Sequence, residues 1–475
     1  MLMDSYAKFR ACITEAAAQF KAIPHTGPVR LISNYDADGI SAGAILIHAL
    51  QQESISFTVS IIQQLTEELM QEYAKDPHPV FLFADLGSKH LRHMHELMPD
   101  KQIFVLDHHE LPEAAEYPNI TLVSPHAFGL DGGVEISASG ISFFFAQAMD
   151  SQNACMAPIA LVGAIGDIQE SNGFKPLNAA ILDIAVQKGL VEVQKGLRCF
   201  GTQTRPIHKI LEYTSDPFIP GVSGSESGAI EFLHLLGIEP KQGKDWKRMT
   251  DLSQEEMENL ITGIILRRVG ETSPEDILGN NYVLVNEQMN SAFRDAKEFA
   301  TLLNACGRMD KSSLGLGACI GDPTSKRKAA AHMLQYKKAI VEAMNWFRDN
   351  KGTPNIAEQD GFVIVNAGDN FMSSIIGTML SIISKSGQYP DGTFLLGLAR
   401  TSPAVTKVSI RMASLKPLQG VALHEVVNAI VKIAGGEAGG HANAAGAMIA
   451  TENEEEFIAA AAEILKEKVG QKALL

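Results

Sequence analysis

The first 170 residues alternate short, β-branched apolar runs with segments of helical character, and this alternation constrains the fold more than any other feature. Strands that alternate with helices indicate βαβ units and a mostly parallel sheet. We therefore predict an α/β domain in this part of the chain. The predicted strands are 29–33, 57–62, 80–84, 102–106 and 120–123, and the predicted helices include 41–50, 66–74 and 91–98.

Four short polar segments interrupt this pattern, at 34–39 (NYDADG), 84–87 (ADLG), 106–110 (LDHHE) and 163–167 (GAIGD). The first three each follow a predicted strand, and the fourth ends an apolar segment. Ligands of open parallel sheets bind outside the carboxyl ends of the strands. We therefore expect the first three segments to converge on one crevice.

The residue types in these segments are those of a metal site. A single Asp after a strand is most often a turn residue or a helix cap, but its recurrence at three strand ends favours a shared function. Gathered carboxylates repel one another, and two divalent cations would neutralise them. Such pairs of metal ions are common devices for cleaving phosphoesters. The candidate ligands offer both oxygen and nitrogen donors, which suit Mn²⁺ or Mg²⁺, and Zn²⁺ less selectively. These ligands are Asp36, Asp38, Asp85, His108 and Asp167.

The remainder of the chain divides into three parts. Residues 201–324 are rich in turns and amphipathic helices and predict a mostly helical insert. Residues 325–352 predict one long connecting helix with a basic start, for which a solvated charge run is the simpler interpretation. Strand-like and helical runs alternate again over 353–475, which predicts a second, smaller α/β domain. The N-terminal domain would then cover 1–200.

Composition bounds the function classes. The 475 residues predict roughly three domains. A net charge of −15 argues against a protein that coats nucleic acid generally, although it leaves room for a local basic groove. No apolar run reaches the roughly 18 residues of a membrane helix. Five cysteines without a C-x-x-C pair, and no apolar signal core, favour free thiols and a cytoplasmic location.

The four polar segments resemble motifs I to IV of the DHH phosphoesterases, in particular the archaeal RecJ-like nucleases. The C-terminal part carries further matches. The strand Ser409-Ile410-Arg411 and the glycine-rich run 435–446 (GGEAGGHANAAG) resemble the S-x-R strand and the GGH motif of the DHHA1 domain. The resemblance thus implies an N-terminal parallel-sheet DHH domain with a helical insert, a connecting helix and a smaller C-terminal α/β DHHA1 domain.

The resemblance also implies roles for these residues. One metal ion would lie between Asn34, Asp36 and Asp85, and a second between Asp38, Asp85, His108 and Asp167. His109 would face the scissile phosphate, and Asp107 would orient His108. Asn34 departs from the His or Asp usual in the family and is a poorer ligand. The expected contacts to substrate phosphate are Ser409, Arg411, Gly439, Gly440 and His441.

The activity implied by the resemblance is a manganese-dependent, single-strand-specific exonuclease, acting 5′ to 3′ on DNA in replication or repair, with RNA as a possible substrate. Two alternatives stay open at this stage. One is a phosphodiesterase for short oligonucleotides or cyclic dinucleotides. The other is a largely non-catalytic replisome scaffold, because relatives of this type also resemble partners of the GINS complex. The retained carboxylates and histidines count against a pure scaffold.

Overall fold

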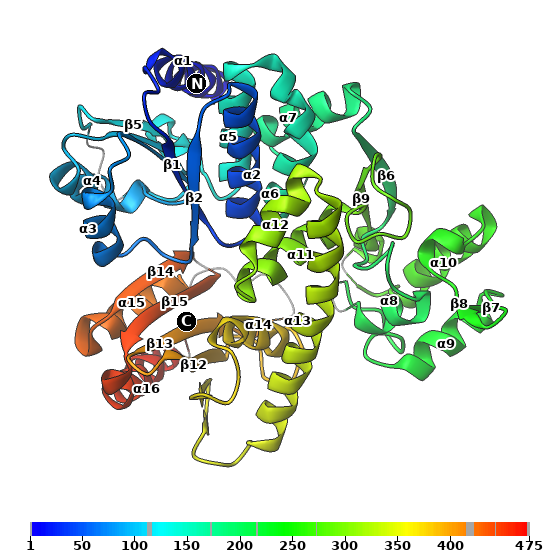
Figure 1. Ribbon diagram of the computed structural model, residues 1–475. Helices are drawn as coiled ribbons and strands as arrows, with labels where there is room; N and C mark the ends of the chain where they lie inside the picture. Colours follow the sequence, from blue (N-terminus) through cyan, green and yellow to red (C-terminus); the bar gives the residue numbers. More distant parts are fainter. Residues whose placement is uncertain are drawn as a thin grey trace. The chain divides into compact units, whose positions relative to one another are not determined.

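The computed structural model describes residues 2–111, 116–171, 173–214, 217–271, 273–414, 422–441 and 443–472. The chain divides into two compact units, Met1–Met333 and Leu334–Leu475. Figure 1 shows the elements of both units. Within the described residues, no helix is long and apolar enough to cross a membrane.

The first unit is built on a five-stranded sheet in the order β2-β1-β3-β4-β5, in which every neighbouring pair is parallel. This confirms the predicted parallel sheet. Four of the five strands begin and end where the apolar runs predict. The strands are β1 (Val29–Asn34), β2 (Phe57–Ile62), β3 (Val80–Ala84), β4 (Gln102–Leu106) and β5 (Ile120–Val123).

Helices cover both faces of this sheet. On one face, the ring of Phe104 contacts Phe20 of α1 and Phe145 of α5 at centroid distances of 5.2 and 6.5 Å. On the other face, Phe81 and Phe83 pack against Tyr73 of α3. Strands β3 and β4 are nearly continuous apolar runs, and successive side chains point to opposite faces of the sheet. Both faces are therefore apolar and need a covering of helices. The helices are α1 (Leu2–Ala22), α2 (Ala37–Gln52), α3 (Glu67–Lys75), α4 (Leu91–Leu97), α5 (Ala138–Met149), α6 (Ala157–Gly166) and α7 (Pro176–Gln187).

A separate hydrophobic core follows α7. Strands β6 (Val191–Leu197) and β9 (Leu278–Leu284) form an antiparallel ladder, and the chain between them folds around its own buried cluster, which includes Ile210, Leu233 and Ile264. The insert is thus connected to the rest of the first unit through one ladder. Its other elements are α8 (Ile207–Tyr213), α9 (Glu226–Leu235), β7 (Lys241–Gln242), β8 (Asp245–Trp246) and α10 (Gln254–Arg267).

Two helices after the insert pack on the sheet-bearing part of the first unit. Helix α11 (Ala296–Arg308) contacts α2 and α6, and α12 (Ser312–Ile320) contacts α2. The predicted 201–324 segment therefore contains two structurally different parts. The first part forms the separate core of the insert, and the last part, α11 and α12, packs against α2 and α6.

The second unit contains a six-stranded mixed sheet in the order β10-β11-β12-β13-β15-β14. The buried side chains of Val408 and Ile410 on one face form a core with α15 and α16, whereas α14 lies over the other face, next to Ser409. This confirms the smaller C-terminal α/β domain. The bounds are α13 (Pro323–Asp349), β10 (Ile356–Gln359), β11 (Phe362–Asn366), α14 (Ser373–Ser384), β12 (Phe394–Ser402), β13 (Val405–Met412), α15 (Leu423–Ala434), β14 (Glu437–His441), β15 (Ala444–Ala450) and α16 (Glu454–Lys472).

The separate core of the insert can be tested because the sequence has only two tryptophans. Trp246 packs on His208 within the insert, and Trp346 packs on Phe371 in the second unit. Ile264 is fully buried, so Ile264→Ala should cost about 2–5 kcal/mol. Urea denaturation followed by fluorescence, in Trp346→Phe and Trp246→Phe backgrounds, should show a lower midpoint for Trp246 only.

Val269→Ala is the control, because this side chain is 70% exposed and its truncation should leave both midpoints in place. An equal fall of both midpoints in Ile264→Ala would show that the insert does not unfold as a separate unit.

Candidate functional site

The strand order places the candidate residues at the switch point of the sheet. The chain runs from β1 to β2 on one side and then to β3 on the other, so the carboxyl ends of β1 and β3 flank the crevice in which ligands of such sheets bind. Asp36 lies in the loop after β1, Asp38 lies in the first turn of α2, and Asp85 directly follows β3. The next strand along, β4, is followed by Asp107 and His108.

The two acidic residues after β1 are held by helix ends. Asp36 is the N-cap of α2 and accepts a hydrogen bond from the N–H of Gly39 at 3.0 Å. Asp38 is fully buried in the first turn of the same helix. Its carboxylate accepts the N–H groups of Ala138 (2.7 Å) and Ser139 (3.0 Å) at the start of α5. The start of α5 thus provides a hydrogen bond to each oxygen of the Asp38 side chain.

Asp85 has an unusual backbone and an unusual side chain. Its φ of 63° lies in the left-handed region, which Asp tolerates better than most residues. The residue is 2% exposed, and its buried Oδ1 atom has no hydrogen-bond partner among the residues that the structure describes. The Nε2 atom of His108 lies 3.3 Å from that oxygen. A buried carboxylate oxygen without a hydrogen bond fits a position that a cation would fill.

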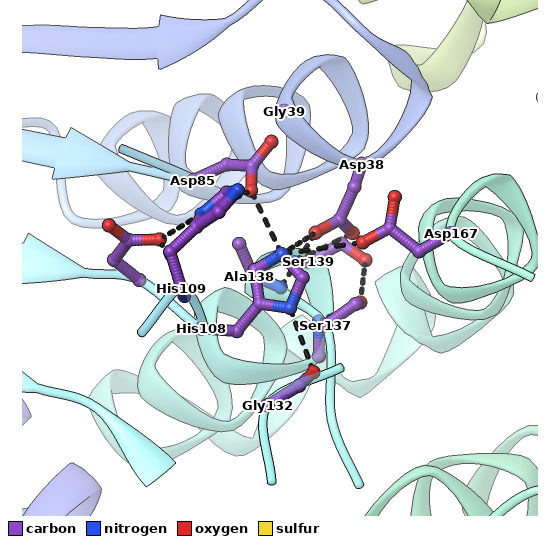
Figure 2. A network of polar contacts seen from close by, with 12 residues as sticks. Asp38, Gly39, Asp85, His108, His109, Gly132, Ser137, Ala138, Ser139 and Asp167 are labelled. Carbon is purple, nitrogen blue, oxygen red and sulfur yellow. Dashed lines mark hydrogen bonds and ion pairs between the residues drawn. The ribbon is translucent and has the colours of Figure 1, made fainter. Parts of the chain in front are cut away.

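The ring of His108 points into the carboxylate cluster, as Figure 2 shows. Its Nδ1 lies 2.9 Å from the carbonyl oxygen of Gly132, which can only accept, so Nδ1 carries the proton. The Nε2 atom therefore faces the carboxylates, at 3.3 Å from Asp167 and 4.0 Å from Asp38. This tautomer is the one in which Nε2 can bind a metal ion.

Residues outside the four motifs fix the position of His108. The carbonyl of Gly132 also accepts a hydrogen bond from Gln169 (3.0 Å), whose own amide oxygen accepts one from Asn178 (2.7 Å). A Cβ on Gly132 would lie 1.9 Å from the carbonyl oxygen of His108, so only glycine fits there. Sequence analysis does not single out Gly132, Gln169 or Asn178, because their contacts depend on tertiary structure.

The second histidine corrects the predicted role of Asp107. The Oδ1 atom of Asp107 accepts from both the N–H (3.2 Å) and the Nδ1 (2.7 Å) of His109, and its Oδ2 accepts from the N–H of Ser88 (2.9 Å). Asp107 thus orients His109, whereas Gly132 orients His108. The reason is the tight turn after β4, in which Asp107 can bond two residues ahead along the chain.

Electrostatics within the cluster follow from burial and crowding. Burial, together with the charges of Asp36 and Asp38, raises the pKa of Asp85 well above its ordinary value. The same causes raise the pKa of Asp167. Burial would lower the pKa of His108, but contact with Asp85 and the charges of Asp167 and Asp38 hold it well above 6.5. The buried, crowded carboxylates therefore favour the binding of protons or of cations.

Asp107 behaves in the opposite way. Burial works against its charged form, but the charge and hydrogen bond of His109, the charge of His108 and the N–H of Ser88 keep its pKa far below the ordinary value. A permanently ionised Asp107 is therefore available to hold the ring of His109.

Two groups of metal-binding atoms result, each within 4.8 Å of one another. One consists of Asp38, His108 and Asp167, and the other of Asp85, His108 and His109. Asp36 is in neither group, but its charge reaches Asp85 and Asp167.

Asn34, a predicted metal ligand, makes a local contact in the turn after β1. Its side-chain oxygen accepts the N–H of Tyr35 at 2.6 Å, so it caps the turn after β1. Helix α11 contacts the end of this loop, where the side-chain oxygen of Asn304 accepts the N–H of Ala37 at 3.1 Å. A Cβ on Gly307 would lie 1.8 Å from the carbonyl oxygen of Tyr35. Helix α11 thus determines the course of the loop that carries Asp36.

The predicted phosphate contacts of the second unit lie on its sheet. Ser409 of β13 faces Gly446 of β15, which in turn faces Gly439 of the last strand, β14. Arg411 donates from Nε to the hydroxyl of Ser381 in α14 (2.9 Å) and from Nη1 to the carbonyl of Ile410 (2.7 Å).

Gly440 has a φ of 126°, and with Gly439 it is exposed. The backbone of His441 ends β14, and its side chain lies outside the described set. The glycine run is thus an edge hairpin of the sheet.

Comparison with known families agrees with this architecture. Residues 28–166 match the DHH family N-terminal domain, 199–279 match the DHH-CID domain, and 360–467 match the DHHA1 domain. The DHH match covers the sheet and the first three polar segments and ends one residue before Asp167, and the DHH-CID match covers most of the insert with its separate core. The chain therefore combines regions that match DHH, DHH-CID and DHHA1 domains.

Its relatives span most of its length. An uncharacterized protein of Methanocaldococcus jannaschii is 26% identical over 96% of this chain and 97% of its own. Among solved structures, an exonuclease RecJ bound to manganese has a TM-score of 0.56 at 15% identity, covering 96% of this chain and 94% of that one. CDC45 from Entamoeba histolytica has a TM-score of 0.62 at 11% identity, covering 98% and 99%.

RecJ from Thermus thermophilus, in complex with Mn²⁺, has a TM-score of 0.57 at 16% identity and covers 96% of this chain. This chain spans about half of the length of that RecJ, 55%. At these identities the solved structures establish the fold.

The close approach of α11 to the loop after β1 gives a test. Glycine in a helix normally costs about 1 kcal/mol relative to alanine, so Gly→Ala should stabilise where there is room. At Gly307 the added methyl would clash with the backbone of Tyr35, and Gly307→Ala should lower the urea midpoint of the first unit. Gly470→Ala is the matched control, because nothing lies near its Cβ position in α16. A stabilising Gly307→Ala would contradict this close packing.

Proposed function

We propose that this protein is a metal-dependent exonuclease that hydrolyses phosphodiester bonds in single-stranded nucleic acid to mononucleotides, 5′ to 3′ on DNA, in replication or repair. The observation that carries the proposal is the buried Oδ1 of Asp85. It has no hydrogen-bond partner within the described part of the chain, and it lies among the imidazole of His108 and the carboxylates of a region that matches a DHH domain. A buried, unsatisfied carboxylate oxygen among metal-ligand side chains supports a position that a cation would fill.

The donor chemistry fits divalent cations. Two ions of Mn²⁺, or Mg²⁺ in its place, would be held by the carboxylates and the imidazole of the cluster. Bound there, they would supply charge stabilisation to a phosphodiester and make water a better nucleophile. RecJ structures with Mn²⁺ and with Mg²⁺ are known, which supports the choice of metals. The proposed ligands are Asp36, Asp38, Asp85, His108 and Asp167, with Asn34 a weak additional donor.

The remaining polar groups of the site would act on the substrate. Asp107 holds His109 through Nδ1, and the ring of His109 is about a quarter exposed. A ring held in this way can present its Nε2 to a phosphate oxygen. His109 would therefore bind the scissile phosphate, and Asp107 would keep the ring in position.

The DHHA1 domain would bind the nucleotide strand by its phosphates. Exposed glycines on an edge strand let a backbone approach closely, and a guanidinium binds phosphate with two hydrogen bonds. The proposed contacts are Ser409, Arg411, Gly439, Gly440 and His441. Arg411 already bonds Ser381 and the backbone, so its guanidinium is pre-oriented.

A second candidate function is a replisome scaffold. The similarity to CDC45 over nearly the whole of both chains supports it, and the GINS complex would be the partner. A phosphodiesterase for short oligonucleotides or cyclic dinucleotides is a further alternative, and it would use the same metal site. Measurements of metal binding and of cleavage separate these functions.

Asp85→Asn tests the metal site. Asn retains the shape and tolerates the left-handed backbone, but it removes a charged ligand. We expect cleavage to fall at least about a thousandfold, since several kcal/mol of stabilisation would be lost. Mn²⁺ at a hundred times its Kd should stabilise the wild type by about 2.7 kcal/mol in thermal unfolding, and the variant much less.

Asp100→Asn, on the exposed surface, is the control and should keep both the activity and the metal response. A metal response without cleavage in the wild type would support the scaffold. Full cleavage by a folded Asp85→Asn would exclude the proposed site.

Digestion of end-labelled substrates tests the activity itself. With Mn²⁺, a 5′-labelled single-stranded DNA should release labelled mononucleotide from the first time point, whereas a 3′-labelled strand should shorten progressively. Duplex DNA should be resistant, and single-stranded RNA tests the preference for sugar. Cleavage confined to dinucleotides or cyclic dinucleotides would favour the alternative phosphodiesterase. Repeating the digestion with GINS tests the proposed partner.

A further inference from the structure

A second cluster of reactive side chains lies in the first unit, apart from the carboxylates. The turn Ser151–Met156 between α5 and α6 carries Cys155, the one exposed cysteine among the five. Its sulfur lies 3.8 Å from Nε2 of His48 in α2. The other ring nitrogen of His48, Nδ1, lies 3.0 Å from the Oδ1 of Asn153. A thiol, an imidazole and an amide are thus in series.

The hydrogen bonds define the roles of these groups. The amide nitrogen of Asn153 donates to the carbonyl of Ala146 at 2.8 Å, so its oxygen is the atom that faces His48. An amide oxygen only accepts, which places the proton of the neutral imidazole on Nδ1. The Nε2 atom then carries the lone pair and faces the thiol of Cys155. A nucleophile next to a base that a third group orients is the arrangement of an activated thiol.

The surroundings of the sulfur also favour the thiolate. Cys155 lies two residues before the first residue of helix α6, Ala157, and the N-terminus of a helix is electropositive. Hydrogen bonding to His48, aided by the charge of Lys188 after α7, lowers the pKa of Cys155 although partial burial opposes the shift. The other four cysteines differ, because burial raises the pKa of Cys12, Cys199, Cys306 and Cys319.

We propose that Cys155 is a thiol-modification site that forms mixed disulfides with low-molecular-weight disulfides, with His48 as its base. His48 Nε2 takes the proton of the Cys155 thiol. The thiolate attacks one sulfur of the disulfide, and the new S–S bond forms as the old one breaks. The departing thiolate takes the proton from His48. The sulfur of Cys155 is oxidised and the departing sulfur is reduced, so no further reagent is needed.

This site is separate from the metal cluster. His48 and Asp38 lie on the same helix, ten residues and therefore about 15 Å apart. Cys155 and Asp167 are likewise at opposite ends of the segment that contains α6. The modification of Cys155 therefore does not depend on the nuclease function, and it can be measured in a protein without nuclease activity.

The test uses the full chain and the aromatic disulfide 5,5′-dithiobis(2-nitrobenzoate). The wild type should show one fast equivalent of released thiolate, which peptide mapping assigns to Cys155. Cys155→Ser should lose this phase, and Cys12→Ser should keep it. His48→Gln should slow it roughly fivefold or more, because the base and its charge are lost.

The pH dependence of the rate distinguishes an activated thiol from a merely exposed one. The titratable group in contact with the sulfur is His48 from α2, and the charge of Lys188 after α7 also acts on it. In the wild type, the fast rate should persist to lower pH than in His48→Gln. Equal rates and equal profiles for the two proteins, or a label spread over several cysteines, would overturn the proposal. If His48→Gln does not fold, peptide mapping still identifies the labelled cysteine. The pH profile of the wild-type rate, compared with that of a small free thiol, then shows whether the Cys155 thiol is activated.

Discussion

The buried carboxylate of Asp38 connects three helices, and the geometry of the site depends on it. It belongs to the first turn of α2, it accepts two N–H groups from the start of α5, and it lies against α6, where a Cβ on Gly163 would come within 2.6 Å of its oxygen. A charged group without hydrogen bonds at this depth would cost several kcal/mol. The helix packing thus satisfies the charge, and the charge fixes how the three helices approach one another.

Much of the fold could be predicted because its strands are short, apolar and separated by clear turn signals. Four strands of the first sheet begin and end as expected. The position of Asp167 could not be predicted as a strand end, because it is the C-cap of α6, a helix that is apolar on every side and lacks helical periodicity. The glycine-rich edge hairpin β14–β15 also lacks the β-branched residues that indicate strands.

The site was predictable in its residue types and less so in its pairings. Which carboxylate meets which imidazole depends on backbone turns, and Asp107 therefore bonds His109 instead of His108. Asn34 caps its own turn, a local contact that competes with a more distant role. The contacts from Gly132 and α11 come from distant parts of the chain. Gly132 is 24 residues from His108, and Asn304 of α11 is 267 residues from Ala37, so no local pattern encodes their approach.

The ladder of β6 and β9 has a consequence for how such proteins change over evolution. Leu197 pairs with Leu278, so the two ends of the insert are neighbours across one ladder, about 5 Å apart. A tight turn of a few residues could join them. The DHH-CID domain can therefore be enlarged, exchanged or lost as a single cassette while the sheet and its carboxylates keep their places, which leaves this domain open to acquiring new partners.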